Sequence, residues 1–434
     1  MQRTPSGQAP TAPRIPLRGR DGARWLFVAL AFAATTLNYL DRQSLSVLAP
    51  VLETQLHMSN AQYGRVLAAF MLAYTIMNGI SGPAIDRLGT KTGYLLTVAW
   101  WSLAEMLHVF ARGTAGLAVC RFLLGGGEAG NWPAGVKVVA EWFPPEERSL
   151  AAGVFNTGSS VGAVLAPPLI VWITLRFGWR AACGAVGAAG FVWVLLWARV
   201  YPRGAGAGLR SARSSAGDPD LHPASDAATA PPAPLRSLLR SRFLWQFTVA
   251  KVFFDPVWYF YTFWYPEYLK VGRGYSLRQI GATAWIPFLG AGLGNLVGGA
   301  AGGWLVRRSA TALAGRKLAA TGFMLAMAAG WLIAVDPSNL RSMAFACLAG
   351  FGYTAALVNL LALPGDLYPS SSVASIWGLA SMGSGFGGMV FSMLTGWMVD
   401  RWSFLPAFYF FSLLPLIAAA AVWTMPQTAG RPTQ

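Results

Sequence analysis

The sequence predicts an all-α membrane protein with twelve transmembrane helices in two bundles of six, and three observations lead to this prediction. Of the 434 residues, 55% are hydrophobic and 12% are charged, whereas a soluble domain carries about 25% charged residues. From Arg24 onward the chain is a succession of apolar segments, each about long enough to cross a bilayer. A polar segment at 202–241 divides these segments into six and six.

The elements follow in order from the amino terminus. The first 23 residues contain no apolar run, so we expect a disordered cytoplasmic tail and not a signal peptide. Spans are expected at 24–52, 61–85, 92–111, 115–140, 148–175, 180–201, 243–269, 278–306, 318–335, 340–364, 372–399 and 402–424. The polar segment is rich in Ala, Pro, Ser, Gly and Arg, which is typical of a disordered linker. The expected domains are the tail 1–23, the N-terminal bundle 24–201, the cytoplasmic linker 202–241, the C-terminal bundle 242–425 and the tail 426–434.

Basic residues orient the chain. The sequence holds 33 Lys and Arg against 17 Asp and Glu, a formal net charge of +16. If both termini lie on one side, that side holds roughly 20 Lys and Arg and the other side about 9, so the positive-inside rule predicts two cytoplasmic termini. The expected location is the bacterial inner membrane. Because the basic residues are scattered, we expect the lipid bilayer and not nucleic acid as their partner.

The few charges inside predicted spans are the candidate functional residues, since an ionised side chain at the bilayer centre costs about 2.5–3.5 kcal/mol. In the first span, Asp41 and Arg42 interrupt an apolar run that resumes at Leu45 and continues to Leu52. The run before Asp41 alone is short for a span. The sequence therefore favours a pair inside the membrane over a pair at its interface.

The fourth span carries a second pair of opposite charges. Arg121 and Glu128 are seven residues apart, which places them on one helix face, about 10.5 Å apart along the axis. Their long side chains could lean toward each other, either as a structural ion pair or as part of a functional site. We favour a site, because a carboxyl group in a dry interior is a candidate for proton binding. The glycines at 125–127 and 383–388 indicate close helix packing.

Two further pairs have weaker cases. Lys251 and Asp255 share a helix face in the seventh span and precede a run of aromatic residues, which is more often packing than a ligand site. We regard this pair as structural or functional with equal weight. Glu105 and His108, three residues apart in the third span, could form a proton pair. Because they lie near the outer end of the span, with no cationic partner in reach by sequence, we favour a solvated rim.

No other chemistry is visible in the sequence. The histidines His57, His108 and His222 lack the spacing of metal ligands. The sequence contains no GxxxxGK[ST] phosphate loop, so ATP hydrolysis is not the expected energy source. We therefore expect no metal, no cofactor and no catalytic residues.

The loop DRLGTKTG at 86–93 resembles the signature loop of the major facilitator superfamily, although Thr90 and Lys91 replace the usual pair of basic residues. The chain also resembles the anion:cation symporter family within it. That resemblance is carried by NYLDR at 38–42, Arg121, GGEAGNWP at 126–133 and EWFP at 141–144. The segments at 131–133, 155–159 and 255–258 are similar to the hexuronate-transporter branch. The family implies the major facilitator fold and a monomer.

The resemblance also implies roles for individual residues. Asp41 and Glu128 correspond to the proton-carrying groups, while Arg42 and Arg121 face the anionic substrate and Glu128. The implied substrate-binding residues are Tyr39, Arg42, Tyr74, Arg121, Ser159, Asn359 and Ser381. At the position of Ser159, galactonate-type relatives carry Gln, which suggests a different sugar here.

The expected function is import of a sugar acid, such as glucuronate or galacturonate, by proton symport and alternating access. In this mechanism protonation of Glu128 releases Arg121 to bind the substrate carboxylate. An exchanger of organic anions or organic phosphates has the same architecture, but it should place a strong cation in each half, and Lys251 is the candidate in the second. A membrane sensor would need an ordered cytoplasmic domain, and the segment 202–241 is too polar and Pro-rich to form one. A membrane enzyme would need a group of catalytic residues, and the acids and bases inside the spans are already assigned to ion pairs.

Overall fold

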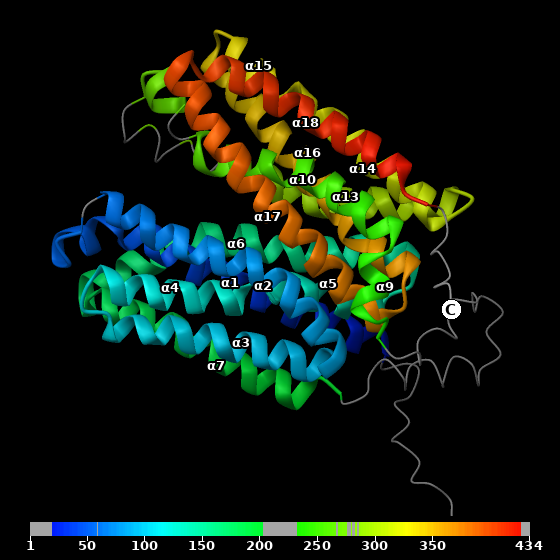
Figure 1. Ribbon diagram of the computed structural model, residues 1–434, viewed down its shortest axis with the longest axis horizontal. Coiled ribbons are helices and arrows are strands. Elements are labelled where there is room, and N and C mark those ends of the chain that lie inside the picture. The colour runs from blue at the N-terminus through cyan, green and yellow to red at the C-terminus, as the bar shows by residue number, and fades with distance from the viewer. Residues whose placement is uncertain are drawn as a thin grey trace, which may run out of the picture.

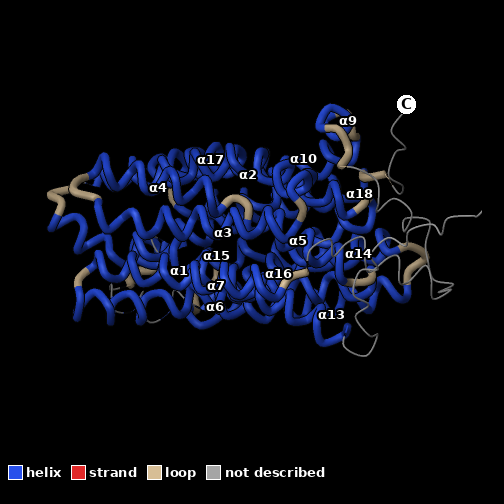
Figure 2. Tube along the Cα trace, turned by 90° about the horizontal axis from the view of Figure 1, so that it is seen from below, coloured by secondary structure: helices blue, strands red, loops and turns tan. Residues whose placement is uncertain are grey.

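The computed structural model describes residues 20–58, 60–202, 232–265, 268–275, 279, 283 and 286–426. Within these ranges the regular structure is entirely helical (Figure 2). The N-terminal bundle consists of α1 (Arg20–Gln55), α2 (Asn60–Leu88), α3 (Thr90–Leu107), a 3-10 turn (His108–Phe110), α4 (Thr114–Glu128), α5 (Asn131–Trp142), α6 (Pro145–Phe177) and α7 (Trp179–Val200). After the short α9 (Leu235–Leu239), the C-terminal bundle consists of α10 (Arg242–Phe263), a π turn (Tyr268–Gly272), α13 (Ile286–Arg308), α14 (Ala312–Ala328), a 3-10 turn (Ala329–Trp331), α15 (Leu332–Val335), α16 (Asn339–Leu367), α17 (Ser370–Arg401) and α18 (Phe404–Thr424).

The prediction of twelve crossings in two groups of six is confirmed. In the described part of the chain, nine helical segments are long and apolar enough to span a membrane. Three further crossings carry more charge or are shorter, namely α3, α10 and the pair formed by α4 and α5. The two groups lie as separate bundles in Figure 1.

The fourth crossing differs from the prediction, because it consists of two helices and not one. α4 ends at Glu128 and α5 begins at Asn131. Pro133 has no N–H to donate to the carbonyl of Ala129, four residues earlier. Ser81 Oγ of α2 donates to that carbonyl in its place, at 3.3 Å. The break places Glu128 and the ring of Trp132 at adjoining helix ends.

The boundaries of the expected domains also shift. α1 begins at Arg20, so residues 20–23 of the expected tail are helical. The short helix α9 lies inside the expected linker 202–241. Residues 1–19, 203–231 and 427–434 lie outside the described residues, so disorder in the tails and linker stays a prediction.

The bundles meet chiefly where α2 packs against α17 and α6 packs against α13. At both contacts the main chains of the two helices touch, because glycine has no Cβ atom and the facing backbone leaves no room for one. We call these two contacts the glycine seams. Their facing pairs are Gly82 with Ala374, Gly378 with Asn78, Gly153 with Asn295 and Gly299 with Ser149. The predicted close packing at 383–388 is confirmed at Gly385, which lies against Thr75 of α2.

We call the end of the molecule that carries α9 the linker end, and the opposite end the distal end. The bundles converge at the linker end and diverge toward the distal end (Figure 1). At the linker end, Asp366 of α16 accepts hydrogen bonds from Arg148 of α6, at 2.7 Å, and from Arg316 of α14. Arg316 also donates to Ser149 Oγ and to the carbonyl of Pro145. We call Arg148, Arg316 and Asp366 the linker-end clamp.

The loop signature supplies a second connection at this end. Asp86 of α2 pairs with Lys137 of α5 at 2.8 Å. Its other carboxylate oxygen accepts the backbone N–H of Ser375, in the first turns of α17, at 2.7 Å. Asp86 thus ties the N-terminal bundle to α17 of the C-terminal bundle.

Candidate functional site

The centre of the N-terminal bundle holds an ion pair between Arg42 of α1 and Glu128 of α4. Arg42 Nε and Nη2 donate to Glu128 Oε2 at 3.1 and 2.9 Å. Glu128 is fully buried, whereas the Arg42 side chain is 27% exposed. The second oxygen of Glu128, Oε1, has no hydrogen-bond partner. Arg42 is therefore the accessible member of a pair whose carboxylate is held in the interior.

Four aromatic rings surround the guanidinium of Arg42. Its Cζ lies 4.7 Å from the ring centre of Tyr74, 5.3 Å from Tyr39, 5.4 Å from Phe70 and 5.8 Å from Trp132. These rings come from α1, α2 and α5, so three helices position one cation. Each ring face attracts a cation by about 0.5–2 kcal/mol. We call this arrangement the Arg42 cage.

The position of Asp41 and Arg42 confirms that they are embedded, because α1 continues without a break to Gln55. The expected contact between Arg121 and Glu128 is wrong. Arg121 instead donates to Ser44 Oγ at 2.7 Å and to the backbone carbonyl of Asp41 at 3.2 Å. The two turns of α4 between Arg121 and Glu128 separate their head groups, so each finds a nearer partner on α1.

The expectation of a solvated rim at Glu105 and His108 is also wrong. Both side chains are buried, with exposures of 0% and 1%. Glu105 Oε1 accepts a hydrogen bond from Ser44 Oγ at 2.9 Å, and Glu105 Oε2 lies 3.5 Å from His108 Nδ1. The packing of α4 and α7 against α3, together with the contact from Ser44 of α1, covers this end of the helix. The sequence could not show that neighbouring helices extend past it.

The remaining predicted substrate residues lie on three other helices. Ser159 of α6 is buried and donates to the carbonyl of Asn156 at 2.7 Å. Asn359 of α16 accepts from Ser149 Oγ at 3.0 Å and donates to two backbone carbonyls, so its amide lies next to the linker-end clamp and not at the Arg42 cage. Ser381 lies half-buried on α17. Their binding roles stay predictions.

Three residues at the site were not assigned roles from the sequence. Phe70 is four residues from Tyr74 on α2, a spacing that signals a shared helix face. Trp132 belongs to the branch-specific segment at 131–133, which could have marked it. Ser44 is three residues after Asp41, and nothing in the sequence indicates that it bridges α1 to α3 and α4.

In the C-terminal bundle, Lys251 and Asp255 form the expected pair on one face of α10, at 2.9 Å. Both partners have second contacts: Lys251 Nζ lies 4.0 Å from the ring centre of Trp377, and Tyr353 donates to Asp255 at 3.4 Å. Lys251 is therefore neutralised and buried.

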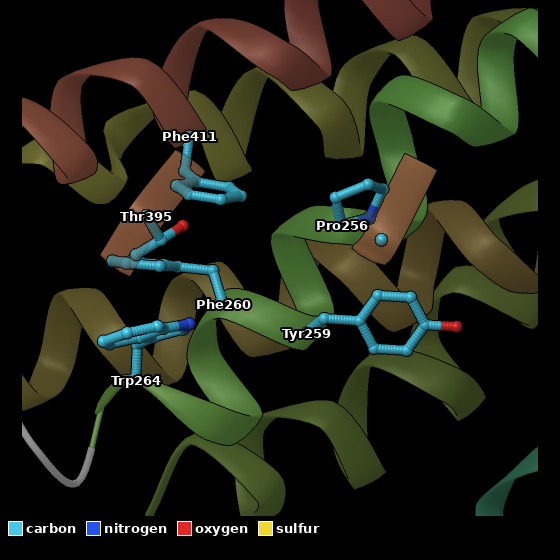
Figure 3. A pocket seen from close by; sticks show the side chains of 7 residues that line it. Pro256, Tyr259, Phe260, Trp264, Thr395 and Phe411 are labelled. Carbon is cyan, nitrogen blue, oxygen red and sulfur yellow. The ribbon is translucent and has the colours of Figure 1, made fainter. Parts of the chain in front are cut away.

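The aromatic run that follows packs tightly. The side chains of Pro256, Tyr259, Phe260, Trp264, Thr395 and Phe411 enclose a gap that leaves no room for a water molecule (Figure 3). Phe260 and Phe411 stack with ring centres 4.3 Å apart. At this level α10 contributes packing, as the sequence favours. Among the described residues no group of His, Cys, Asp and Glu is placed to hold a metal ion.

Two bundles of six helices, one of which holds a buried glutamate paired with an accessible arginine, are the architecture of a membrane transporter, and the comparisons agree. The chain belongs to the Major Facilitator Superfamily, whose family model matches residues 31–340. It is 32% identical over 416 residues to the hexuronate transporter of Escherichia coli (strain K12), covering 95% of this chain and 96% of that protein. It is 36% identical over 282 residues to the galacturonate transporter of Dickeya chrysanthemi, covering 64% of this chain and 81% of that protein.

The fold is also similar to solved structures. The proton:xylose symporter XylE, bound to 6-bromo-6-deoxy-D-glucose, superposes with a TM-score of 0.75 at 15% identity, covering 95% of this chain and 98% of that one. The Escherichia coli fucose:proton symporter FucP superposes with a TM-score of 0.65 at 16% identity, covering 94% and 100%. The relatives and the fold are those of transporters and not of enzymes. The relatives also confirm the resemblance to the hexuronate branch.

Proposed function

We propose that the protein imports a hexuronate, such as glucuronate or galacturonate, by proton symport and alternating access. The observation that carries the proposal is the pair of Arg42 and Glu128 inside the Arg42 cage. The group suited to bind the substrate carboxylate is held by a group suited to bind a proton. Similarity to hexuronate and galacturonate transporters supports the choice of substrate.

The coupling follows from competition for one guanidinium. While Glu128 is ionised, it occupies Nε and Nη2 of Arg42. A proton on Glu128 removes its charge and frees the Arg42 fork, which binds a carboxylate through two parallel hydrogen bonds. The rings of the cage hold the guanidinium in place during the exchange. Proton binding therefore precedes substrate binding. The arginine that protonation of Glu128 releases is Arg42, and not Arg121 as expected from the sequence.

The membrane potential favours such coupling. Moving an anion into a negative cytoplasm costs about 2.3 kcal/mol per charge per 100 mV. One proton carried with the substrate cancels this cost, and a second proton reverses it. Asp41, buried beside Arg42, is the second proton-carrying group of the proposal.

We infer that the linker end faces the cytoplasm of a bacterial inner membrane, since the basic tail and loops favour that side. The linker-end clamp then closes the cytoplasmic side, and the bundles diverge toward the outside. In alternating access one bundle rocks against the other around a site near the bilayer midplane, so import requires the clamp to open.

An organic-anion exchanger is the competing function. It needs a free cation in each bundle, and Lys251 is bound to Asp255 and Trp377, which argues against it. The test is uptake into proteoliposomes with an imposed proton gradient, using glucuronate, galacturonate, galactonate and a sugar phosphate. We expect gradient-driven accumulation of a hexuronate. Gradient-independent exchange alone, or no uptake of any sugar acid, would contradict the proposal.

A further inference from the structure

The N-terminal bundle buries more negative than positive side chains. Its fully buried ionisable groups are Asp41, Asp86, Glu105, His108, Arg121, Glu128 and Lys137. Asp86 is neutralised by Lys137, and Glu128 by Arg42. Two carboxyl groups, Asp41 and Glu105, are then left with one cation, Arg121.

Arg121 reaches these two carboxyl groups only indirectly. Among the ion pairs between described residues it has none. Its Nη1 donates to the backbone carbonyl of Asp41, and its Nη2 donates to the hydroxyl of Ser44. That hydroxyl lies 2.7 Å from the Asp41 carbonyl and 2.9 Å from Glu105 Oε1. Ser44 is thus the bridge between the cation and Glu105.

Both carboxyl groups present an oxygen that can hold a proton. Asp41 Oδ1 and Glu105 Oε2 are buried and have no hydrogen-bond partner. Two ionised carboxylates beside one guanidinium would leave a net negative charge in a dry interior, which is costly. One proton on either carboxyl group restores neutrality.

His108 completes the cluster on the distal side of Glu105. Its Nδ1 lies 2.9 Å from the carbonyl of Ala104, so Nδ1 carries the hydrogen and donates it. The nitrogen that faces Glu105 is therefore a donor, and Nε2 is buried without a partner. The other titratable groups that face Glu105 are Cys120 of α4 and Cys183 of α7. Both are thiols, so they supply no positive charge to balance a carboxylate.

We propose that Glu105 and Asp41, the two buried carboxyl groups beside Arg121, hold one proton between them, so that Glu105 is a third proton-carrying residue that works away from the substrate. The inference deepens the proposed symport and rests on it for its transport consequence. The proton exchanged at Glu128 controls Arg42, whereas the proton at Glu105 and Asp41 keeps the interior behind Arg121 neutral.

The first test is chemical and uses the unchanged full chain in detergent. Dicyclohexylcarbodiimide modifies protonated carboxyl groups in apolar surroundings, and peptide mass spectrometry locates the adduct. We expect adducts on both Glu105 and Asp41 at neutral pH, and their loss at high pH. Glu147, a half-exposed carboxylate paired with Arg24 at 2.8 Å, is the internal control and should stay unmodified. Absence of an adduct on Glu105 at every pH would overturn the proposal.

The second test is the infrared absorbance of protonated buried carboxyl groups. Glu105→Gln and Asp41→Asn should each lose the absorbance of one such group, because the remaining carboxylate then pairs with Arg121. The matched control Glu147→Gln should keep it. Retention in Glu105→Gln shows that the proton is elsewhere, and retention in Asp41→Asn alone shows that it is not shared; either result overturns the proposal.

The transport consequence is measured separately. In proteoliposomes, Glu105→Gln should reduce the protons carried per glucuronate by about one, with the half-saturating glucuronate concentration changed by less than about twofold. Unchanged stoichiometry would overturn the role in coupling. If the unmodified protein transports no hexuronate, the proposed function fails, while the chemical and infrared tests still decide whether Glu105 holds a proton.

Discussion

The two bundles share one architecture and treat their buried charges differently. In the C-terminal bundle, Lys251 and Asp255 contact each other, and each has a further partner in Trp377 or Tyr353. In the N-terminal bundle, buried oxygens of Asp41, Glu105 and Glu128 have no partner. A satisfied pair is locked, whereas a partly satisfied network can change its proton count. Among the described residues, buried carboxylate oxygens without a hydrogen-bond partner occur only in the N-terminal bundle, which is the bundle that we propose binds the protons.

The largest effect should follow from Arg42→Ala. Removing one partner of a buried, hydrogen-bonded charge pair costs about 2–5 kcal/mol, and 1.4 kcal/mol is tenfold in affinity. We expect glucuronate binding to weaken by about 100-fold or more, measured by calorimetry on the purified protein. Arg42→Lys keeps the charge but loses the fork, so it should bind with intermediate affinity. Normal binding by Arg42→Ala would remove the site from the N-terminal bundle.

Glu128→Gln should separate coupling from binding. Gln cannot ionise, so Arg42 stays free for the substrate whatever the proton gradient. We expect gradient-driven accumulation to be lost and exchange of labelled for unlabelled hexuronate to remain. The control is Glu147→Gln, which lies outside the site and should accumulate substrate normally. Accumulation by Glu128→Gln at the unmodified level would make Glu128 structural, like Asp255.

Asp366→Asn tests the linker-end clamp, which joins the bundles. The change removes the charge that Arg148 and Arg316 share, so the linker end should open more often. A coupling free energy of about 1–3 kcal/mol changes a population by about 5- to 150-fold. We expect a cysteine placed by Ser375→Cys to react with a soluble thiol reagent about tenfold faster in the Asp366→Asn background. An unchanged rate would show that the clamp does not limit opening.

The smallest effect on transport should come from replacing the whole C-terminal pair. Lys251→Met with Asp255→Leu exchanges a buried ion pair for apolar side chains, a change that is often neutral or stabilising by about 1–4 kcal/mol. We expect uptake to be retained and the thermal midpoint in detergent to be unchanged or higher. Lys251→Met alone should destabilise the protein by about 3–5 kcal/mol, since it leaves Asp255 unpaired. Loss of uptake in a well-folded double variant would place a working charge in the second bundle.

Much of this arrangement could be predicted from the sequence. Hydropathy and the polar segment at 202–241 give the twelve helices and the two bundles, because the bilayer fixes the length of each crossing. Scarce charges inside the spans point to Asp41, Arg42, Arg121 and Glu128. The break before Asn131 also has a sequence signal in Pro133, which the apolar run around it conceals.

The pairing of these charges could not be predicted, because it depends on where helices cross. Spacing along α4 suggests that Arg121 meets Glu128, whereas α1 supplies nearer partners to both. The burial of Glu105 and His108 likewise depends on the packing of α4 and α7 against α3. Position within a span says how deep a residue lies, and the neighbouring helices decide whether it is covered.

The glycine seams have a consequence for the motion between bundles. Side chains that interdigitate must change rotamer before one surface can turn on another, but Gly82 and Gly378 offer only main chain on either side of the contact. The glycine seams therefore keep the two bundles at a fixed separation and let one rotate against the other without a change of rotamer. The Cβ atom introduced by Gly378→Ala would clash with the backbone of α2 at Asn78. It would separate α2 from α17 and hinder the rotation of the bundles without contacting a charged residue.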